Sequence, residues 1–358
     1  MNERVKICFF IGSFQTGGAE YLLLNTIRYL DKKKFKPFLC VFSENGELRE
    51  EYKKLNLKIK KFDVNTKFKA FTEFFRFIRF LRKNKIEVIH IHLVGTFLFS
   101  ISGALISGVK KRILHWHNIY ERERSKYYSV KIGSMFATNI LAISKIVSER
   151  NCRIYKIKKS KVNIFYNAID TSAYELNQNN AEMIIGTIGK FTRQKGYDTL
   201  LTAMSQVVKD ESNCRLEIIG SGELLNEMKT LSEKLNIQNY VKFIGSVPNN
   251  VVRKYLQRWR VFVLASRWEG FGIVLIEAMA SGLPIIATNV DAIPEIVINN
   301  KTGLLCDPEN PTALAQQIKK LIKNQNKSKS MGLKGRIRTE KHFSIDNMIK
   351  LLEQYYLK

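Results

Sequence analysis

Short apolar runs rich in β-branched residues alternate along this chain with stretches of helical periodicity, and this alternation constrains the fold more than any other feature. The strand candidates of the first half are residues 5–11, 37–42, 57–62, 86–92, 112–116 and 140–143. Those of the second half are residues 183–189, 215–220, 241–245, 261–265, 284–288 and 303–306. Helical patterns lie between the strands, for example at 197–209, 224–235 and 273–281. The alternation predicts parallel sheets that helices cover on both faces.

Two such series in succession predict two doubly wound, Rossmann-like α/β domains. A chain of 358 residues has room for both, since a domain takes about 150 residues. The polar stretch after Asn167 marks the boundary, which gives domains at 1–167 and 168–343. A last helix at 344–358 follows a complete second series and is free to pack on the first domain. Ligands bind beyond the carboxyl ends of the strands in such folds, so two facing domains are expected to enclose one cleft.

The chain is strongly basic. Its 59 Lys and Arg against 32 Asp and Glu give a net charge of +27, and residues 1–180 alone hold 34 basic and 15 acidic residues. The first half is therefore expected to meet an anionic partner, such as nucleic acid, phospholipid or a phosphorylated substrate. The alternative is a solvated surface that reflects a Lys-rich composition. The 45% of hydrophobic residues excludes a wholly disordered chain.

Cysteine usage and the N-terminus indicate a cytoplasmic location. The five cysteines are widely spaced and form neither a disulfide framework nor a zinc pattern, which indicates a reducing compartment. The N-terminus enters an apolar strand directly and lacks the features of a signal peptide. Residues 93–109 carry no charge and approach the length of a membrane span, but Gly and Ser dilute them. The preferred interpretation is the end of a buried strand followed by a packed helix.

Two loops that follow first strands carry candidate anion-binding residues. In the first domain, Gly17 and Gly18 stand between a strand and a helix, where they let the backbone approach a ligand and where the helix N-terminus offers free N–H groups. A purely structural turn is the alternative. In the second domain, Arg193 and Lys195 follow the strand that ends at Gly189, and both suit a diphosphate. An exposed pair of solvated cations is the alternative there.

A third cluster carries two carboxylates. Glu269 stands in the glycine-rich loop 266–273 after a strand, and Glu277 follows eight positions later on the next helix. Both can point to one cleft and accept hydrogen bonds from sugar hydroxyls. A tight helix-to-strand turn follows at 278–284, and then the pair Pro294-Glu295. These elements, from residue 266 to residue 295, form one string of motifs.

With this string the sequence resembles the GT-B-fold retaining glycosyltransferases, specifically family 4 of the nucleotide-sugar enzymes. The matching elements occur in the expected order over nearly the whole chain. They are Gly17-Gly18-Ala19-Glu20, His117-Asn118, Asn167-Ala168-Ile169-Asp170, Gly189 with Arg193 and Lys195-Gly196, Glu269-Gly270-Phe271-Gly272 with Glu277, and Pro294-Glu295. The segment from Glu269 to Glu277 is the most specific of these.

The resemblance implies a role for each site residue. Arg193 and Lys195 would neutralise the departing diphosphate, Glu269 would contact the transferred sugar, and Glu277 the ribose of the nucleotide. His117 would contact the donor sugar or the reaction centre, with His115 as second choice and a structural role as the alternative for either. The other donor-binding candidates are Gly17, Gly18, Gly189, Gly270, Phe271, Gly272 and Ile273.

The sequence departs from the family pattern in two places. Asp291-Ala292 stand where the family often has paired glycines, which puts any prediction of the donor sugar in doubt, and Ala168 replaces a glycine. The sequence also contains no Asp-x-Asp, so no metal held by paired aspartates is expected on the diphosphate. Leaving-group charge would fall to Arg193 and Lys195, and no cofactor is expected.

The helix predicted at 67–83 has aromatic and basic faces. The apolar stripe expected to face the core comprises Phe71, Phe74, Phe75, Ile78 and Leu81. The expected basic face comprises Arg76, Arg79 and Lys83, and Phe77 and Phe80 are expected to flank it. Such a face suits an anionic membrane surface, and the alternative is a core helix with a solvated face.

Together these features predict a metal-independent, peripheral membrane glycosyltransferase. The resemblance implies that it would move a hexose or N-acetylhexosamine, with retention, from a UDP donor onto a lipid-linked or saccharide acceptor in surface polysaccharide synthesis. A nucleotide-sugar epimerase of the same fold is one alternative. A nucleic-acid-binding protein is the other, motivated by the +27 charge. Because neither zinc-finger spacing nor an RNA-binding aromatic motif occurs, no nucleic acid partner is expected.

Overall fold

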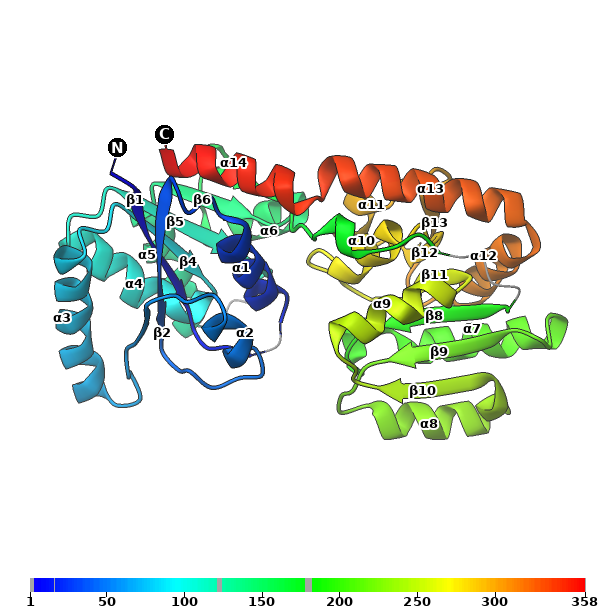
Figure 1. Ribbon diagram of the computed structural model, residues 1–358. Helices are drawn as coiled ribbons and strands as arrows, with labels where there is room; N and C mark the ends of the chain where they lie inside the picture. Colours follow the sequence, from blue (N-terminus) through cyan, green and yellow to red (C-terminus); the bar gives the residue numbers. More distant parts are fainter. Residues whose placement is uncertain (1–2, 16, 121–123, 178–181, 358) are drawn as a thin grey trace. The chain divides into compact units, whose positions relative to one another are not determined.

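The chain forms two compact units, each built on one parallel sheet. Unit 1 comprises Met1–Asn167 and Ile345–Lys358, and unit 2 comprises Ala168–Ser344. The computed structural model describes residues 3–15, 17–120, 124–177 and 182–357. Figure 1 labels the helices and strands of both units.

Unit 1 contains a seven-stranded parallel sheet in the order β3-β2-β1-β4-β5-β6-β7. Its strands are β1 (Val5–Ile11), β2 (Phe35–Val41), β3 (Ile59–Lys61), β4 (Val88–His92), β5 (Lys111–Trp116), β6 (Asn139–Ala142) and β7 (Val162–Ile164). The central strands are buried on both faces, as their continuous apolar runs predict. Each strand candidate of the first half is confirmed, and the sequence analysis misses only β7.

Helices cover both faces of this sheet. They are α1 (Gly18–Tyr29), α2 (Arg49–Lys53), α3 (Lys67–Lys83), α4 (Val94–Ile106), α5 (Arg124–Phe136), α6 (Lys145–Tyr155) and the C-terminal α14 (Ile345–Leu357). Helix α4 contacts both α3 and α5, and α14 contacts α1. The C-terminal helix therefore completes unit 1 after the chain has passed through unit 2 (Figure 1).

The structure confirms the extent of α3 but corrects its orientation. Phe77 and Phe80 are 0% and 8% exposed, whereas Phe71 and Phe75 are 63% and 55% exposed. The interpretation that placed Phe71 and Phe75 in the core and Phe77 and Phe80 beside the basic face is therefore wrong. The Phe77 ring packs against Phe62, with ring centroids 5.1 Å apart. Its Cδ1 lies 2.6 Å from where a Cβ on Gly103 of α4 would stand, so this glycine makes room for the ring.

Unit 2 contains a six-stranded parallel sheet in the order β10-β9-β8-β11-β12-β13. Its strands are β8 (Ile184–Ile188), β9 (Arg215–Ile219), β10 (Val241–Gly245), β11 (Val261–Leu264), β12 (Ile285–Thr288) and β13 (Gly303–Cys306). Its helices are α7 (Tyr197–Asp210), α8 (Leu225–Lys234), α9 (Asn249–Arg258), α10 (Ile273–Ala280), α11 (Ile293–Ile296), α12 (Pro311–Lys323) and α13 (Gln325–His342). All strand candidates of the second half are confirmed.

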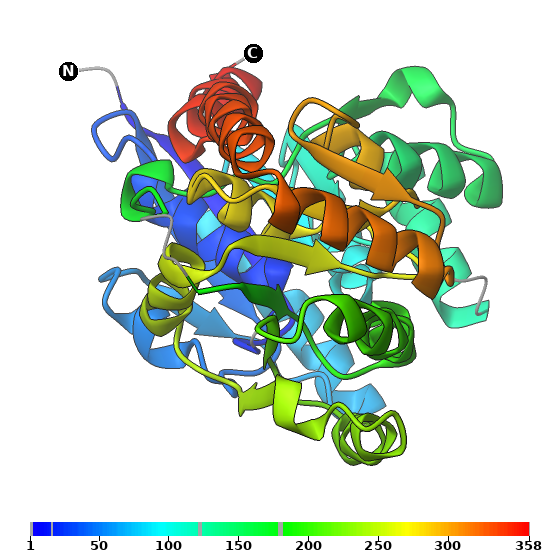
Figure 2. The same cartoon turned by 90° about the vertical axis from the view of Figure 1, so that its right-hand side faces the viewer.

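One face of this sheet forms a core with α7, α8 and α12, and the other is covered by α9, α10 and α13 (Figure 2). The layered arrangement confirms the predicted α/β class. In both sheets the strand order reverses beside the first strand, between β1 and β4 in unit 1 and between β8 and β11 in unit 2. Ligands of doubly wound sheets bind beyond the carboxyl ends of the strands at such points. The loops after β8 and β11 are therefore the first place to look for a site in unit 2.

Candidate active site

The loops after β8 and β11 touch each other through a glycine. Gly196 ends the turn Arg193–Lys195 with φ +61°, and a Cβ at this position would stand 2.2 Å from the carbonyl oxygen of Ala265. Any side chain would therefore push the two loops apart, besides the strain of the left-handed backbone. The β11 loop is also bound directly, since the Arg267 N–H donates to the Gln194 carbonyl at 2.7 Å.

Lys195 and Glu269 form an ion pair across these two loops. The Lys195 Nζ lies 2.5 Å from the Glu269 Oε2, and the side chains are only 16% and 10% exposed. Burying two charges is costly unless they are paired and further hydrogen-bonded. Here the Ser266 hydroxyl approaches the same Oε2 at 3.5 Å, and the Glu269 backbone N–H donates to Asp291 Oδ2 at 3.1 Å. The pair is therefore held in place before any ligand arrives.

Asp291 stands where the family pattern often has a glycine, and its backbone conformation is one that suits glycine. Its φ is +45°, in the left-handed region that glycine adopts without strain. Aspartate tolerates this region better than most residues. The Asp291 carboxylate accepts a hydrogen bond from the Glu269 backbone N–H. An aspartate here therefore helps to hold the Lys195–Glu269 pair in position, which a glycine side chain could not do.

Arg267 joins the two loops, a role that the sequence analysis misses. Its guanidinium donates to Asp198 Oδ2 at 2.6 Å, to Glu309 Oε1 at 2.7 Å and to the Arg193 carbonyl at 2.9 Å. The hydrogen bond to Asp198 is the main reason that the pKa of Arg267 is raised. In contrast, the Arg193 side chain is exposed, and its guanidinium has no partner among the described residues. Arg193 is therefore a cation of this loop that is available to a ligand, as is the exposed Lys190.

Glu277 lies on α10 in a different environment from Glu269. The Tyr174 hydroxyl donates to its Oε1 at 2.9 Å, and the Arg253 guanidinium stands over the Tyr174 ring. Burial raises the pKa of Glu277 to about 7, against the smaller opposing effects of the Tyr174 hydrogen bond and the Arg253 charge. This carboxyl can therefore change its protonation state near neutral pH. No sequence signal singled out Tyr174.

The remaining candidates of unit 2 frame the start of α10. Gly272 caps the helix with φ +93°, beside Gly270 and Ile273. The Phe271 side chain is buried, and its ring packs against Phe343 with centroids 5.9 Å apart. Phe271 can therefore offer a ligand its backbone but not its ring. Gly189, after β8, has its carbonyl oxygen 1.9 Å from where a Cβ on Gly220 would stand.

The candidates of unit 1 lie beyond β1 and β5. Gly17 caps α1 and Gly18 begins it. His117 follows β5 and is 5% exposed, with its Nε2 2.9 Å from His92 Nδ1. Burial lowers the pKa of His117 to about 3, so the ring is neutral at physiological pH. His115 is buried two residues earlier. Arg193, Lys195, Glu269 and Glu277, in contrast, all belong to unit 2, where the structure directly joins Lys195 to Glu269.

Two family models match consecutive parts of the chain. "Glycosyltransferase Family 4" matches residues 16–173, and "Glycosyl transferases group 1" matches residues 169–338. The chain belongs to the glycosyltransferases. This glycosyltransferase is 29% identical over 251 residues to CapM of Staphylococcus aureus, a capsular polysaccharide biosynthesis glycosyltransferase, and the match covers 64% of each chain. It is 27% identical over 334 residues to CapH of the same organism, which covers 89% of this chain and 91% of CapH.

A solved structure supports the same fold. The crystal structure of HepE of Anabaena in complex with UDP and glucose superposes on this glycosyltransferase with a TM-score of 0.84, covering 98% of this chain and 99% of that chain. The sequence identity is 17%, so the likeness concerns the fold. The prediction of a GT-B-type fold with two Rossmann-like domains is confirmed. Among the described residues, no helix is both long and apolar enough to cross a membrane.

Proposed function

We propose that the protein transfers a sugar, with retention, from a nucleoside diphosphate donor to a lipid-linked or saccharide acceptor in the synthesis of a surface polysaccharide. UDP is the proposed nucleotide. The observation that carries the proposal is the arrangement beyond β8 and β11. There the Lys195–Glu269 ion pair lies in the same loops as Arg193, whose guanidinium is exposed and has no partner among the described residues. The capsular relatives and the UDP complex of a protein with the same fold support it.

The two cations would act on the leaving group. As the bond between the sugar and the diphosphate breaks, negative charge grows on the departing oxygen, and Arg193 and Lys195 would stabilise it without a metal held by paired aspartates. Lys195 already has a carboxylate partner, so its Nζ is fixed at the mouth of the sheet. Arg193 supplies the planar fork that binds phosphate oxygens in pairs.

The two carboxylates would bind the donor at either end. Glu269, fixed by Lys195, Ser266 and Asp291, would accept hydrogen bonds from the hydroxyls of the transferred sugar. Glu277, on α10, would accept them from the ribose. Gly17, Gly18 and His117 of unit 1 are proposed to contact the donor phosphates and sugar. Gly189, Gly270, Phe271, Gly272 and Ile273 would contribute backbone contacts.

Kinetics of Arg193→Ala and Lys195→Ala test the proposal. Removing one group that stabilises transition-state charge costs about 10²–10³ in kcat, and we expect kcat for donor hydrolysis to fall by that factor while KM changes less. Lys209→Ala is the matched control, because Lys209 is exposed at the far end of α7 and carries the same charge. Near-normal turnover in both site variants would contradict the proposal.

The two alternatives give different products. A nucleotide-sugar epimerase would return a changed nucleotide sugar without labelling an acceptor, whereas a transferase moves labelled sugar into a lipid or saccharide fraction. A protein that only binds nucleic acid would neither change the nucleotide sugar nor label an acceptor, and it would bind DNA with or without a nucleotide sugar present. Incubation with labelled UDP-sugars in the presence of membrane lipid extract separates the three functions.

We further propose that the protein binds the cytoplasmic face of an anionic membrane through α3. Phe68, Phe71 and Phe75 are exposed on this helix. The exposed basic residues of the same helix are Lys67, Lys69, Arg76, Arg79, Arg82 and Lys83. Exposed aromatic rings beside several cations complement a surface of anionic lipid head groups. This face replaces the one that the sequence predicted, since Phe77 and Phe80 are in the core.

A further inference from the structure

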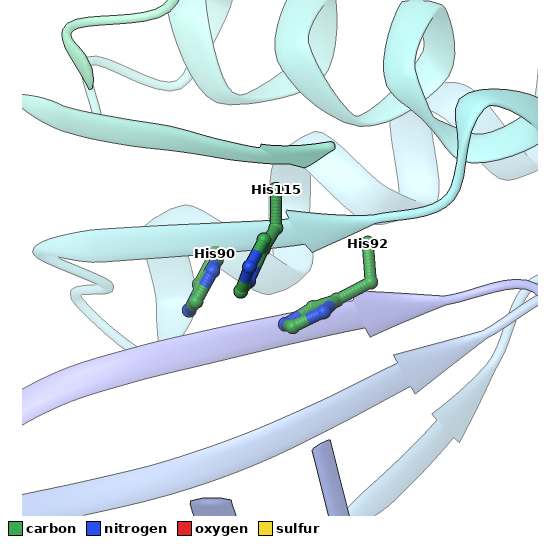
Figure 3. Close-up of side chains that lie close together, drawn as sticks. All are labelled: His90, His92 and His115. Carbon is green, nitrogen blue, oxygen red and sulfur yellow. The ribbon is translucent and has the colours of Figure 1, made fainter. Parts of the chain in front are cut away.

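Four of the five histidines of the chain gather at one place in unit 1. His90 and His92 alternate along β4, and His115 and His117 end β5 or follow it directly. Side chains two apart on a strand share a face, and His92 is the direct neighbour of His115 in the parallel register. All four are at most 5% exposed. Figure 3 shows the rings of His90, His92 and His115 gathered together.

Several ring nitrogens in this cluster are buried without a partner among the described residues. They are Nε2 of His90, Nε2 of His92, both nitrogens of His115 and Nδ1 of His117. A buried polar atom that is left without a hydrogen bond destabilises the folded state. An arrangement that leaves several unpaired nitrogens together therefore calls for a ligand that can bind more than one of them at once.

One nitrogen from each of His90, His92 and His115 lies within 4.8 Å of the others. Zinc–nitrogen bonds of about 2.0–2.1 Å in a tetrahedral site place ligand nitrogens about 3.4 Å apart. Small rotations of the three rings would close that difference. Three histidines with an open fourth position for water are a known zinc ligand set.

The opposite nitrogens of two of these rings are already bonded. His90 Nδ1 lies 2.7 Å from the Tyr356 hydroxyl of α14, and His92 Nδ1 lies 2.9 Å from His117 Nε2. Histidines that bind a metal almost always have their second ring nitrogen held by such a neighbour, which fixes the orientation of the ring. With Nδ1 held, Nε2 is the free atom on both His90 and His92.

We propose that His90, His92 and His115 bind one divalent transition-metal ion, Zn²⁺ by preference, with Tyr356 and His117 orienting the ligands. Imidazole nitrogens favour Zn²⁺, Cu²⁺ and Ni²⁺ over Mg²⁺ or Ca²⁺. Burial lowers the pKa of all three rings, so they are present in the neutral form that coordinates metals. The site lies in unit 1, and none of its three ligands is among the residues proposed to bind the donor, although the orienting residue His117 belongs to both proposals. Its metal would tie α14 to β4 through Tyr356.

Metal analysis of tag-free protein tests the proposal. We expect close to one equivalent of Zn²⁺ per chain, and visible ligand-field bands when Co²⁺ replaces it in chelator-treated protein. His115→Gln should lose the metal and the Co²⁺ bands. His342→Gln is the matched control, because His342 is the one histidine outside the cluster and should leave both unchanged.

Tyr356→Phe keeps the ring in the core and removes only the hydroxyl, so it tests the site where His115→Gln does not fold. Loss of an orienting partner typically lowers metal affinity about 10–100-fold, and a competition titration with a chromophoric chelator should show a drop of that size. Metal-free native protein whose chelator-treated form takes up no Co²⁺ would overturn the proposal. Retention of full metal content in His115→Gln would do the same.

Discussion

At the scale of single residues, the two carboxylates of the candidate site differ in what holds them. Glu269 has a charged lysine partner, with Lys195 Nζ 2.5 Å from its Oε2. Glu277 has a neutral tyrosine hydroxyl as its nearest partner, and burial raises its pKa to about 7. The carboxyl of Glu277 therefore titrates within the physiological range.

We expect donor affinity to rise with pH through the titration of Glu277. An ionised carboxylate is the stronger acceptor for ribose hydroxyls. With a pKa near 7, its ionised fraction grows about tenfold between about pH 6 and pH 8. UDP-glucose is the suitable probe, because both of its phosphates are esterified and stay ionised over this range. Calorimetric titrations should show the affinity rising in the wild type and a flat, weak profile in Glu277→Gln.

The free energy of unfolding provides a control, because it should fall with rising pH where the donor affinity should rise. Because the folded-state pKa is raised above the unfolded value of 4.5, the unfolded chain loses this proton first, and the free energy of unfolding falls as pH rises from about 4.5 to 7. Glu277→Gln should therefore gain stability relative to the wild type across that window. A variant that binds UDP-glucose as tightly as the wild type at pH 8 would show that Glu277 does not contact the ribose.

Asp291 predicts an order of stability among its variants. Asp291→Ala loses the acceptor for the Glu269 N–H and keeps a side chain at φ +45°. Asp291→Gly loses the same acceptor but relieves the backbone. A left-handed conformation costs a residue with a Cβ about 1 kcal/mol more than glycine, so urea unfolding should show the alanine variant less stable by that amount. Equal stability of the two variants would mean that the backbone strain is absent.

At the scale of elements, the sequence predicts where α3 lies but not which side of it is buried. The segment carries phenylalanines around most of its circumference, so its apolar periodicity fits more than one orientation. The orientation is decided by what packs against the helix, and Phe62 and Gly103 lie far from it in sequence. The sequence analysis misses β7, whose three residues are all half-buried and show no alternation of buried and exposed side chains.

The same distinction holds for the candidate site. The loops containing Arg193, Lys195 and Glu269 can be found from glycine and charge spacing, because each follows a strand directly. Arg267 cannot, since its partners Asp198 and Glu309 come from distant parts of unit 2. To predict the histidine cluster from the sequence, one would need to know that β4 and β5 are neighbours in the sheet. Two His-x-His patterns at successive strand ends were the available signal.

The corrected orientation of α3 leads to a test of membrane binding. We expect the protein to bind vesicles that contain anionic lipid, not zwitterionic ones, and to be released by high salt. Each basic residue near such a surface contributes about 1 kcal/mol. Replacing Phe68, Phe71 and Phe75 with Ser should weaken binding at low salt, as should replacing Arg76, Arg79 and Lys83 with Glu.

The control for this test is Ile337→Ser, which removes a similarly exposed apolar side chain from α13 of unit 2. It should leave vesicle binding unchanged, and none of the variants should alter hydrolysis of the donor. Undiminished binding after both sets of α3 substitutions would show that this helix does not contact the membrane. Equal binding to neutral vesicles would contradict the electrostatic argument.

At the scale of the whole molecule, unit 1 is not continuous in sequence. Its last helix is added only after all of unit 2 has been made, and α14 is fixed by specific contacts. The Glu353 carboxylate accepts from the Asp31 backbone N–H at 3.0 Å, and the Lys111 Nζ donates to the Tyr356 carbonyl at 2.7 Å. The buried side chains of α14 are Ile345, Met348, Ile349, Leu352 and Tyr356.

Deleting residues 345–358 should therefore destabilise unit 1 and spare unit 2. Each fully buried side chain of this kind contributes about 1.5–3 kcal/mol, so their combined loss is comparable to the whole stability of an ordinary domain, about 5–15 kcal/mol. Calorimetric scans should show the transition of unit 1 lost or moved to much lower temperature. The transition that UDP-glucose raises should remain where it was, because the proposed nucleotide contacts Arg193, Lys195 and Glu277 all lie in unit 2. Leu351→Ser, at an exposed position of α14, should leave both transitions in place. A truncated protein that unfolds like the wild type would mean that α14 covers unit 1 without stabilising it.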